Sequence, residues 1–524
     1  MLLLLACVGT EADPVDPPAR EWALGDEPVD TGGPDTGGTQ DTGVTSDVVA
    51  DGQWDVIVVG TGPAGAAAAL TAREAGASVL LLEREDDPGL GLVTGGRAFA
   101  VGTPFQASAG VEDSVEAAVA EWPEITGVSG ELPGVREFLA ASADTLLWLT
   151  TFGLVVPHVA GERDAGLVPR VHALDWSETP TGNGTELLAH FDGELRTGVE
   201  VTAPLLEAGA VVGVRWTDLA TGLEGASRAG AVVLATGGFL RDPDEVARVA
   251  PALAGRRIVY ETNPTSDGGG LPFLRAVGAG SLGAENIGVY VHSIEDPWLP
   301  EGESLLGLGI EDGILVDATG ARFANEDLQR SLDLYDVLPD GEIYAVLSDA
   351  LADGLLFNRP YYNWSDPPEA EAVTLDEVAA LAEDVFIADA LEDAAVYAGV
   401  DAGGLVATVD AWNVNFEAGI PDPFGRDLAG AVPLTGDRWV LLRLSPGLAK
   451  NFGGVATDVE GHVLDAAGVP VPGLYAAGEV AGMLLGGGGG DGFSGSVNAC
   501  FWGGRVAGAA AAGFAGVTDT SDTE

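Results

Sequence analysis

The amino-acid sequence predicts an α/β fold with a parallel sheet, and two stretches carry that prediction. Residues 54–85 read as a strand, a glycine turn, an alanine-rich helix and a second strand, because the run Asp55–Val59 is β-branched and too short for a helix. A later apolar run, 229–234, stops in the small-residue turn Ala235-Thr236-Gly237-Gly238. Such a turn leaves backbone N–H groups at the carboxyl edge of a sheet, where open α/β folds bind nucleotides, although an ordinary β-α connection has the same pattern.

The turn after the first strand has the spacing G-x-G-x-x-G, with glycine at 60, 62 and 65. The first glycine permits the tight turn, the second lets a pyrophosphate approach the backbone, and the third lets the helix pack closely on the strand. The helix amino terminus offers free N–H groups and the positive end of a dipole. Glu83 ends the second strand where an acid can accept hydrogen bonds from a ribose 2′-hydroxyl. These features predict a dinucleotide site rather than a merely structural turn, and the motif by itself fits FAD and NAD equally.

Composition limits the partners of the chain. The 524 residues suggest about three structural units. There are 81 acidic and 23 basic residues, a formal charge of −58, so nucleic acid and anionic membrane surfaces would be repelled. The two cysteines, Cys7 and Cys500, form neither a disulfide framework nor a metal-ligand spacing, and no metal site is expected.

The amino-terminal residues 1–7, MLLLLAC, resemble the end of a bacterial lipoprotein signal in which Cys7 would carry the lipid. A basic region and a longer apolar run, which a secretory signal also has, are missing from the sequence. Residues 8–52 are rich in Pro, Gly, Asp and Thr and predict a disordered linker, and residues 515–524 predict a disordered tail. We therefore expect an exported, lipid-anchored protein, with a cytoplasmic one as the alternative if the match is accidental.

Further elements follow from periodicity and turn residues. Residues 88–96 form a second glycine-rich loop, 115–122 and 135–152 have helical periodicity, and 187–191 predict another helix. Residues 199–216 read as two strands joined by a turn at Ala208-Gly209. Near the carboxyl end, Val471–Ala476 is strand-like, and 496–512 has the composition of a small-residue helix after the loop GGGGGDGFSGS. The five glycines of that loop are the pattern either of a binding loop or of a flexible linker.

Six motifs together resemble one family. They are GTGPAG at 60–65 with Glu83, PGLGLVTGG at 88–96, AVVLATGGF at 231–239, GARFANE at 320–326, FGGVATD at 452–458 and VPGLYAAGEVAG at 471–482. In this order they resemble the FAD-dependent oxidoreductase 2 family, which includes fumarate reductases, succinate dehydrogenase flavoproteins and 3-ketosteroid dehydrogenases. The resemblance implies a discontinuous Rossmann-like FAD-binding domain, residues 53–286 and 448–514, with an inserted α+β capping domain, 287–447, that binds substrate.

The resemblance also implies the residues that bind FAD. They are Gly60, Gly62, Pro63, Ala64, Gly65, Glu83, Arg84, Thr94, Gly95, Gly96, Ala235, Thr236, Gly237, Gly238, Gly478, Glu479, Gly495 and Ser496. The helix that begins near Ser496 would direct its positive end at the pyrimidine edge of the flavin, where negative charge accumulates on reduction.

The resemblance implies fewer catalytic residues than FAD-binding residues. Arg330, beyond the GARFANE motif, occupies the position of a proton donor, with a surface ion pair as the alternative. An arginine that donates a proton would need a neighbouring acid pathway to supply it, and Glu326 and Asp327 are the candidates near it in the sequence. His292 falls at the position of a substrate-binding histidine, or is a core or surface residue. Lys450, the only lysine of the chain, lies in the loop that would face the flavin.

The implied activity is hydride transfer between flavin N5 and an activated C=C or CH–CH bond of a small organic substrate, with an unknown electron donor or acceptor. A histidine before Gly453-Gly454 and an arginine after the AAGE motif, which bind the substrate carboxylates in the reductases, are absent from this sequence. We therefore expect a substrate other than a typical dicarboxylate. The alternatives are a ketosteroid dehydrogenase-like enzyme and a flavin-binding surface lipoprotein without catalysis.

Overall fold

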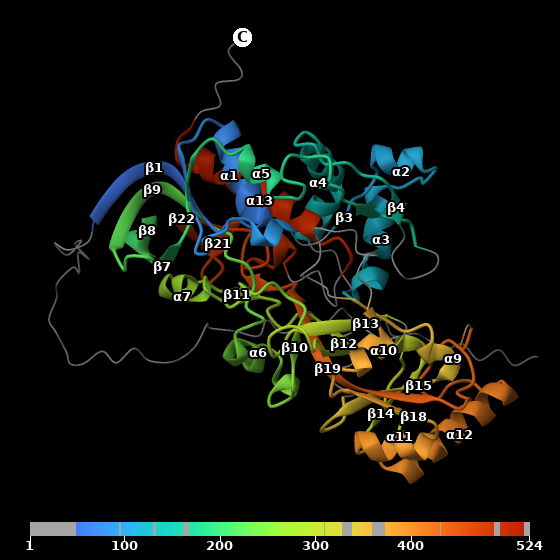
Figure 1. Ribbon diagram of the computed structural model, residues 1–524. Helices are drawn as coiled ribbons and strands as arrows, with labels where there is room; N and C mark the ends of the chain where they lie inside the picture. The colour runs from blue at the N-terminus through green and yellow to red at the C-terminus, as the bar shows by residue number, and fades with distance from the viewer. Residues whose placement is uncertain are drawn as a thin grey trace, which may run out of the picture.

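The computed structural model of the chain describes residues 49–93, 96–128, 133–160, 167–308, 310–326, 338–358, 373–429, 431–486 and 493–517. Figure 1 shows two lobes: one is built on a mainly parallel sheet that contains β1 and β9, and the other contains β14, β15 and the helices α11 and α12. The long strand β19, Trp439–Asn451, belongs to the second lobe and leads back toward the first.

The sheet of the first lobe has eight strands, with the path β21-β22-β9-β1-β2-β6 and with β7 and β8 attached beside β9. Neighbours from β22 to β6 are parallel, whereas β21, β8 and β7 are antiparallel to their partners. The strands are β1 Val49–Val59, β2 Val79–Leu82, β6 Glu194–Arg196, β7 Val199–Glu207, β8 Ala210–Asp218, β9 Glu224–Leu234, β21 His462–Leu464 and β22 Pro470–Ala476. The predicted α/β fold and its β-α-β unit are confirmed.

Two helices pack face to face on this sheet, and their small residues explain the contact. Helix α1, Pro63–Glu74, lies against α13, Val497–Phe514, near the centre of the lobe (Figure 1). A methyl group added at Gly504 would lie 2.1 Å from the Ala64 carbonyl oxygen, and one added at Gly508 would lie 2.4 Å from that of Ala68. The alanine and glycine content of both segments therefore permits a backbone-to-backbone approach that larger side chains would prevent.

The strand β1 begins at Val49, within the stretch that composition assigned to the linker. Val49 and Ala50 pair with Gly225 and Ala226 of β9, and a register irregularity follows before Gln53. The Asp51 carboxylate forms an ion pair with Arg196. Residues that composition marks as linker are thus held here by long-range pairing, which a local pattern does not reveal. The residues before Val49 and after Val517 lie outside the described part.

The helices predicted at 115–122, 135–152 and 187–191 are present with shifted ends, whereas one further short helix and a three-stranded sheet beside them were not predicted. The helices are α2 Pro104–Ser108, α3 Val115–Thr126, α4 Pro133–Thr150 and α5 Glu186–Ala189, and the three-stranded sheet beside them contains β3 Arg97–Phe99, β4 Val159–Ala160 and β5 Val171–Ala173. The turn between β7 and β8 occurs at Ala208-Gly209 as predicted, with positive φ at both residues, which is the geometry of a tight hairpin.

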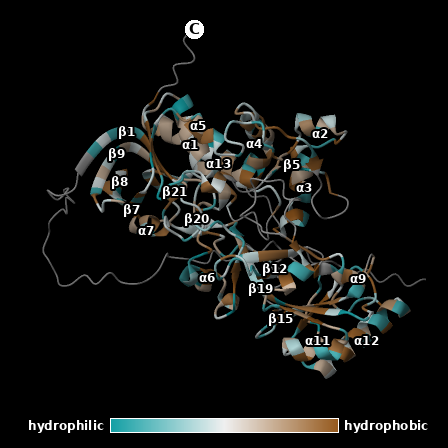
Figure 2. Cartoon of the chain, viewed as in Figure 1, coloured by the Kyte–Doolittle hydropathy of each residue, from teal (hydrophilic) through white to brown (hydrophobic). Residues whose placement is uncertain are grey.

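The second lobe is a nine-stranded sheet with the path β14-β15-β19-β12-β13-β16-β17, and with β10 and β18 attached to β19. Its other strands are β10 Val259–Tyr260, β12 Ile287–Glu295, β13 Ser304–Leu308, β14 Ile314–Asp317, β15 Ile343–Ser348, β16 Leu356–Asn358, β17 Val373–Thr374 and β18 Val385–Ala388. The helices α9 Asp349–Ala352, α10 Leu375–Ala379, α11 Leu391–Ala398 and α12 Ala402–Ala418 accompany it. The strands around the β15 label are largely brown, the colour of apolar residues (Figure 2), and Tyr344 to Leu347 of β15 are buried.

The link between the lobes contains α6 Pro243–Val249, α7 Leu271–Ala276 and a two-stranded sheet of β11 Ser281–Leu282 and β20 Gly454–Val455. Strand β12 begins at Ile287, whereas β19 runs without interruption across the expected boundary at 447–448. The division into a flavin domain and a cap therefore stays a prediction. No helix among the described residues is long and apolar enough to cross a membrane.

Candidate functional site

A cavity of about 480 Å³ lies at the carboxyl edge of the parallel sheet. Its wall includes the turn after β1, the end of β2, the turn after β9, the turn after β22 and the amino terminus of α13. Tyr290 of β12 and Leu306 of β13 complete the wall from the second lobe. Segments far apart in the sequence thus meet at the edge where parallel α/β sheets bind nucleotides.

Most of the predicted FAD-binding residues line this cavity: Gly60, Gly62, Pro63, Ala64, Glu83, Arg84, Ala235, Thr236, Gly237, Gly478, Glu479, Gly495 and Ser496. Two others, Gly65 and Gly238, pack closely against residues next to the cavity. A methyl group at Gly65 would lie 1.9 Å from the Gly60 carbonyl oxygen, and one at Gly238 would lie 2.3 Å from Asn451 Oδ1. The Gly96 carbonyl accepts a hydrogen bond from Leu174 N–H. Thr94 and Gly95 lie outside the described residues.

The first two glycines of the turn differ in their surroundings. Gly60 has φ +100°, and a methyl group there would lie 2.3 Å from the Ala235 carbonyl oxygen. Gly62 is the N-cap of α1, and a methyl group there would meet nothing within 4 Å. No side chain caps this helix. The first N–H groups of α1 therefore face an open approach, which suits a diphosphate.

Glu83 joins the glycine turn to the end of β2. Its Oε2 accepts hydrogen bonds from Thr61 N–H at 3.0 Å and from the Thr61 hydroxyl, and its Oε1 accepts one from Glu85 N–H at 3.0 Å. The next residue, Arg84, donates to Asp267 Oδ2 at 2.8 Å. The Glu83 carboxylate is therefore fixed in the wall of the cavity and retains acceptor capacity for ribose hydroxyls.

A set of polar and ionisable residues lies around the start of α13. Lys450 Nζ donates to Ser496 Oγ at 3.1 Å, and Glu479 Oε1 accepts from Asn451 N–H at 2.8 Å. Burial raises the pKa of Glu479 to about 7, although the Asn451 N–H and the Lys450 charge act in the opposite direction. Burial together with the Glu479 charge raises the pKa of Cys500 to about 12. At neutral pH the Cys500 thiol is therefore protonated, and the Glu479 carboxyl is near its titration midpoint.

The residues present fit a flavin dinucleotide. Thr236 Oγ1 is buried in the cavity wall and has no hydrogen-bond partner among the described residues, so it is available to a ligand. The open approach at Gly62, the carboxylate of Glu83 and the amino terminus of α13 are distributed along the same cavity. They supply groups for a diphosphate, a ribose and a ring system that gains negative charge.

The structure describes the side chain of only one of the three predicted catalytic residues. Lys450 lines the cavity. His292 belongs to β12, two positions after Tyr290, and its side chain lies outside the described part, as does Arg330. Glu326 is buried, and its carboxylate accepts hydrogen bonds from Leu315 N–H at 3.0 Å and from Arg322 Nε at 2.9 Å. This carboxylate is engaged in a buried ion pair, which favours a structural role over the acid pathway considered from the sequence.

Several residues of the wall were not predicted from the sequence. Glu261 is buried, and its Oε1 accepts hydrogen bonds from the hydroxyls of Ser293 and Ser304. Asn263, Asp267 and Arg97 also line the cavity. The polar run 261–267, ETNPTSD, could have been noticed as a loop rich in hydrogen-bonding residues that directly follows a strand. Tyr290 and Leu306 carry no comparable local signal.

Comparison with known proteins decides which dinucleotide the site takes. A family model described as FAD binding domain matches residues 55–493. The chain belongs to the FAD-dependent oxidoreductase 2 family. FAD is the cofactor of this flavoprotein. The predicted family, fold class, cofactor and enzyme class are confirmed.

Three similar proteins illustrate the range of the family. The chain is 30% identical over 512 residues to urocanate reductase of Eggerthella lenta, which covers 90% of the chain and 76% of the relative. It is 28% identical over 447 residues to NADH:fumarate oxidoreductase of Klebsiella pneumoniae, which covers 83% of the chain but only 45% of that relative's length. The structure of 3-ketosteroid-Δ4-(5α)-dehydrogenase from Rhodococcus jostii in complex with 4-androstene-3,17-dione is similar with a TM-score of 0.68 and 25% identity, over 90% of the chain and 99% of the dehydrogenase.

Proposed function

We propose that this flavoprotein transfers a hydride between FAD and an activated C=C or CH–CH bond of a small organic molecule that carries at most one negative charge. The observation that supports this most directly is the composition of the cavity. Its wall joins the predicted flavin-binding residues Gly478 and Ser496 to Tyr290 and Leu306 of the second lobe. A substrate beside the flavin would therefore contact an aromatic ring and an apolar side chain, which shield it from water.

In this proposal the chain provides binding, orientation and charge. FAD supplies the exchange of a hydride with a carbon atom of the substrate. The amino terminus of α1 binds the diphosphate, Glu83 binds the ribose, and Thr236 Oγ1 binds a polar atom of the cofactor. The amino terminus of α13 faces the pyrimidine edge of the flavin. Arg330 delivers the proton that accompanies the hydride, and His292 orients the substrate.

The preference for a weakly charged substrate follows from the charges of the cavity. Among the described residues that line it, the cations are Arg84, Arg97 and Lys450, and the acids are Glu83, Glu85, Asp87, Glu200, Glu261, Asp267 and Glu479. Arg84 is already paired with Asp267. Removing each carboxylate of a dicarboxylate from water without a paired cation costs several kcal/mol. A cavity with this excess of acids favours a monoacid such as urocanate or a neutral enone such as 4-androstene-3,17-dione over fumarate.

The test is the anaerobic reoxidation of the reduced flavoprotein by fumarate, by unsaturated monoacids and by enones. We expect saturable reoxidation by at least one monoacid or enone and slow reoxidation by fumarate. Rapid, saturable reoxidation by fumarate at sub-millimolar concentration would contradict the charge argument. The absence of reoxidation by every unsaturated compound, with FAD bound, would favour a flavin-binding protein without catalysis.

The role of Arg330 has its own test in the same assay. General acid catalysis typically contributes 10²- to 10⁴-fold, so the variant Arg330→Ala should lose that much turnover. Reduction of its flavin by an artificial donor should be unchanged, because that reaction bypasses the substrate. An Arg330→Ala variant with full turnover would assign this arginine to a surface ion pair.

We further propose that the protein is exported and anchored by a lipid on Cys7, which would place it at a membrane surface with an electron partner of unknown identity. The support is the MLLLLAC sequence followed by a long polar linker. The variant Cys7→Ser should move the protein from the membrane fraction to the soluble fraction. An identical distribution of both forms would exclude the anchor.

A further inference from the structure

Lys450 is the single lysine in the 524-residue chain, and the structure fixes its position closely. It lies in the 13-residue strand β19, where it pairs with Gly288 of β12. A methyl group at Gly288 would lie 3.5 Å from Lys450 Cγ, an ordinary van der Waals distance, so the aliphatic part of the lysine side chain runs beside this residue. From this strand the side chain reaches the cavity wall.

The ammonium group is held at the beginning of α13. Lys450 Nζ donates to Ser496 Oγ at 3.1 Å across 46 positions of sequence. Ser496 is the N-cap of α13, yet its side chain makes no capping hydrogen bond to the helix. The Ser496 hydroxyl therefore accepts from the lysine, and the first N–H groups of α13 have no side-chain cap. A full positive charge and the positive end of an 18-residue helix dipole meet at one place in the wall.

The other ionisable groups around Lys450 do not form a close ion pair with it. Glu479 accepts a hydrogen bond from the backbone N–H of Asn451, and the Lys450 charge acts to lower its pKa, but no salt bridge joins the two side chains among the described residues. Cys500, one helical turn beyond Ser496, has a raised pKa and is a neutral thiol at physiological pH. Glu261 accepts its hydrogen bonds from Ser293 and Ser304. The charge of Lys450 is therefore only partly compensated by the protein.

We propose that Lys450, together with the α13 amino terminus, binds the reduced form of FAD more strongly than the oxidised form and so raises the reduction potential of the cofactor. Two-electron reduction of a flavin adds negative charge to its pyrimidine edge, and a fixed positive charge nearby stabilises that state. The inference rests on the orientation of FAD in the proposed function, with the flavin at the start of α13. Lys450 is then an electrostatic residue and not the proton donor.

The experiment measures the midpoint potential of bound FAD by spectroelectrochemistry for the full chain and for three variants. Lys450→Met keeps the length of the side chain and removes the charge, and Lys450→Arg keeps the charge. We expect Lys450→Met to lower the ratio of the affinities for reduced and oxidised FAD about tenfold. For a two-electron couple this corresponds to a midpoint potential lower by about 30 mV. Lys450→Arg should restore most of the potential.

The control variant is Arg84→Met, which removes a cation from the same cavity near Glu83 and Asp267. It should weaken the binding of both forms of FAD alike and leave the potential unchanged. If Lys450 served only packing, Lys450→Met would lower the thermal stability or the affinity for both forms without moving the potential, and this result would overturn the inference.

The outcome can be separated from that of the proposed function. A lower potential in Lys450→Met supports the inference even if no unsaturated compound reoxidises the flavin. An unchanged potential in a folded, FAD-loaded Lys450→Met protein overturns the inference even if the chain reduces enones rapidly.

Discussion

Glu83 stabilises the turn between β1 and α1, and its proposed role in binding the cofactor can be tested separately. Its carboxylate accepts hydrogen bonds from Thr61 and Glu85 in the structure, and we propose that it also accepts one from the ribose of FAD. A charge-assisted hydrogen bond contributes about 1.5–3 kcal/mol. We therefore expect Glu83→Ala to lower the affinity for FAD by about one to two orders of magnitude.

Titration of the apo-protein with FAD, followed by flavin fluorescence, measures this effect. Glu85→Ala is the matched control, because Glu85 also lines the cavity but pairs with Arg84 through its side chain. The control should retain most of the affinity. Parental affinity in a folded Glu83→Ala protein would show that the ribose is bound elsewhere.

Glu479 predicts a pH dependence of the stability of the apo-protein. Burial raises its pKa from 4.5 to about 7, so between these values the native state binds more protons than the unfolded chain. The free energy of unfolding therefore falls as the pH rises through this window. Because Glu479 is partly exposed to the solvent in the cavity, we expect a decrease on the order of 1–2 kcal/mol.

Urea unfolding of apo-protein at pH 5 and pH 7.5 tests this, with Glu479→Gln beside the parent. The glutamine variant should lose less stability over the same interval, since its amide does not titrate. If the two proteins lose the same free energy, the Glu479 carboxyl is ionised throughout the window and its environment is more polar than the structure indicates.

At the scale of elements, the turn between β1 and α1 predicts opposite results for two glycines. Gly60→Ala places a side chain at φ +100° and 2.3 Å from the Ala235 carbonyl oxygen, so we expect a loss of about 2–5 kcal/mol in folding stability. Gly62→Ala places its methyl group in open space, at a residue that lines the cavity. It should leave the stability of the apo-protein nearly unchanged and lower the affinity for FAD at least tenfold, because the methyl group obstructs the diphosphate.

Thermal unfolding of the apo-proteins and FAD titration separate these two effects. Each variant is the control for the other, since both add one methyl group to the same turn. Equal destabilisation of the two apo-proteins would contradict the steric difference between the two glycines. Unchanged FAD affinity in Gly62→Ala would mean that the turn is not the diphosphate site.

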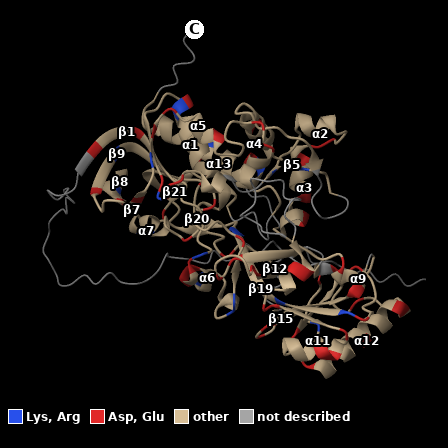
Figure 3. Cartoon of the chain, in the orientation of Figure 1, with Lys and Arg blue, Asp and Glu red and all other residues tan. Residues whose placement is uncertain are grey.

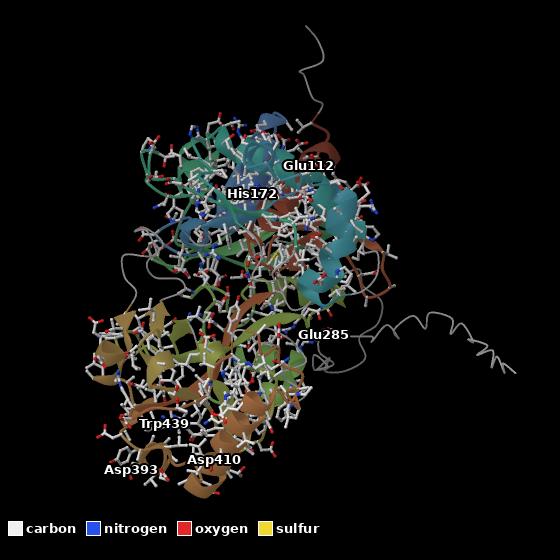
Figure 4. The ribbon with its side chains drawn as sticks, turned by 90° about the vertical axis from the view of Figure 1, so that its right-hand side faces the viewer. Glu112, His172, Glu285, Asp393, Asp410 and Trp439 are labelled. Carbon is white, nitrogen blue, oxygen red and sulfur yellow. The ribbon has the colours of Figure 1, made fainter. Side chains whose placement is uncertain are left out.

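At the scale of the whole molecule, charge dominates the surface. The ribbon positions of acidic residues, coloured red, are more frequent than the blue positions of basic residues over both lobes (Figure 3), in agreement with the formal charge of −58. Figure 4 places Glu112 in one lobe and Asp393 and Asp410 at the far end of the other. All three are exposed, so like charges are distributed over the length of the molecule and repel one another.

We therefore expect salt to stabilise the fold. Raising the salt concentration from about 0.01 M to about 1 M shortens the Debye length from about 30 Å to about 3 Å and screens this repulsion. A gain on the order of 1 kcal/mol would raise the unfolding temperature by about 1 °C, because the entropy of unfolding of a chain this long is on the order of 1 kcal/mol per kelvin. Sodium chloride and potassium chloride should act alike at equal ionic strength. A falling unfolding temperature would show that the ion pairs of the structure contribute more to stability than the repulsion removes.

Local sequence was sufficient to predict the part of the cavity wall formed by β1, the glycine turn and the end of β2. The strand, the glycine turn and the acid at Glu83 were predicted because they depend on steric and hydrogen-bonding rules that act over a few residues. The hairpin at Ala208-Gly209 and the helix after Ser496 follow from the same short-range rules, and the structure contains both. The order of motifs was sufficient to indicate the family, since each motif is itself local.

Tertiary structure decided which of these local elements contact one another. The pairing of Val49 with Gly225, the continuous strand β19 and the contact of Lys450 with Ser496 all bring together residues distant in sequence. Glu261, Tyr290 and Leu306 likewise reach the cavity only through the packing of the second lobe on the first. Such contacts depend on which strands become neighbours in a sheet, and that choice is made by the burial of the whole core rather than by the residues next to each position in the chain.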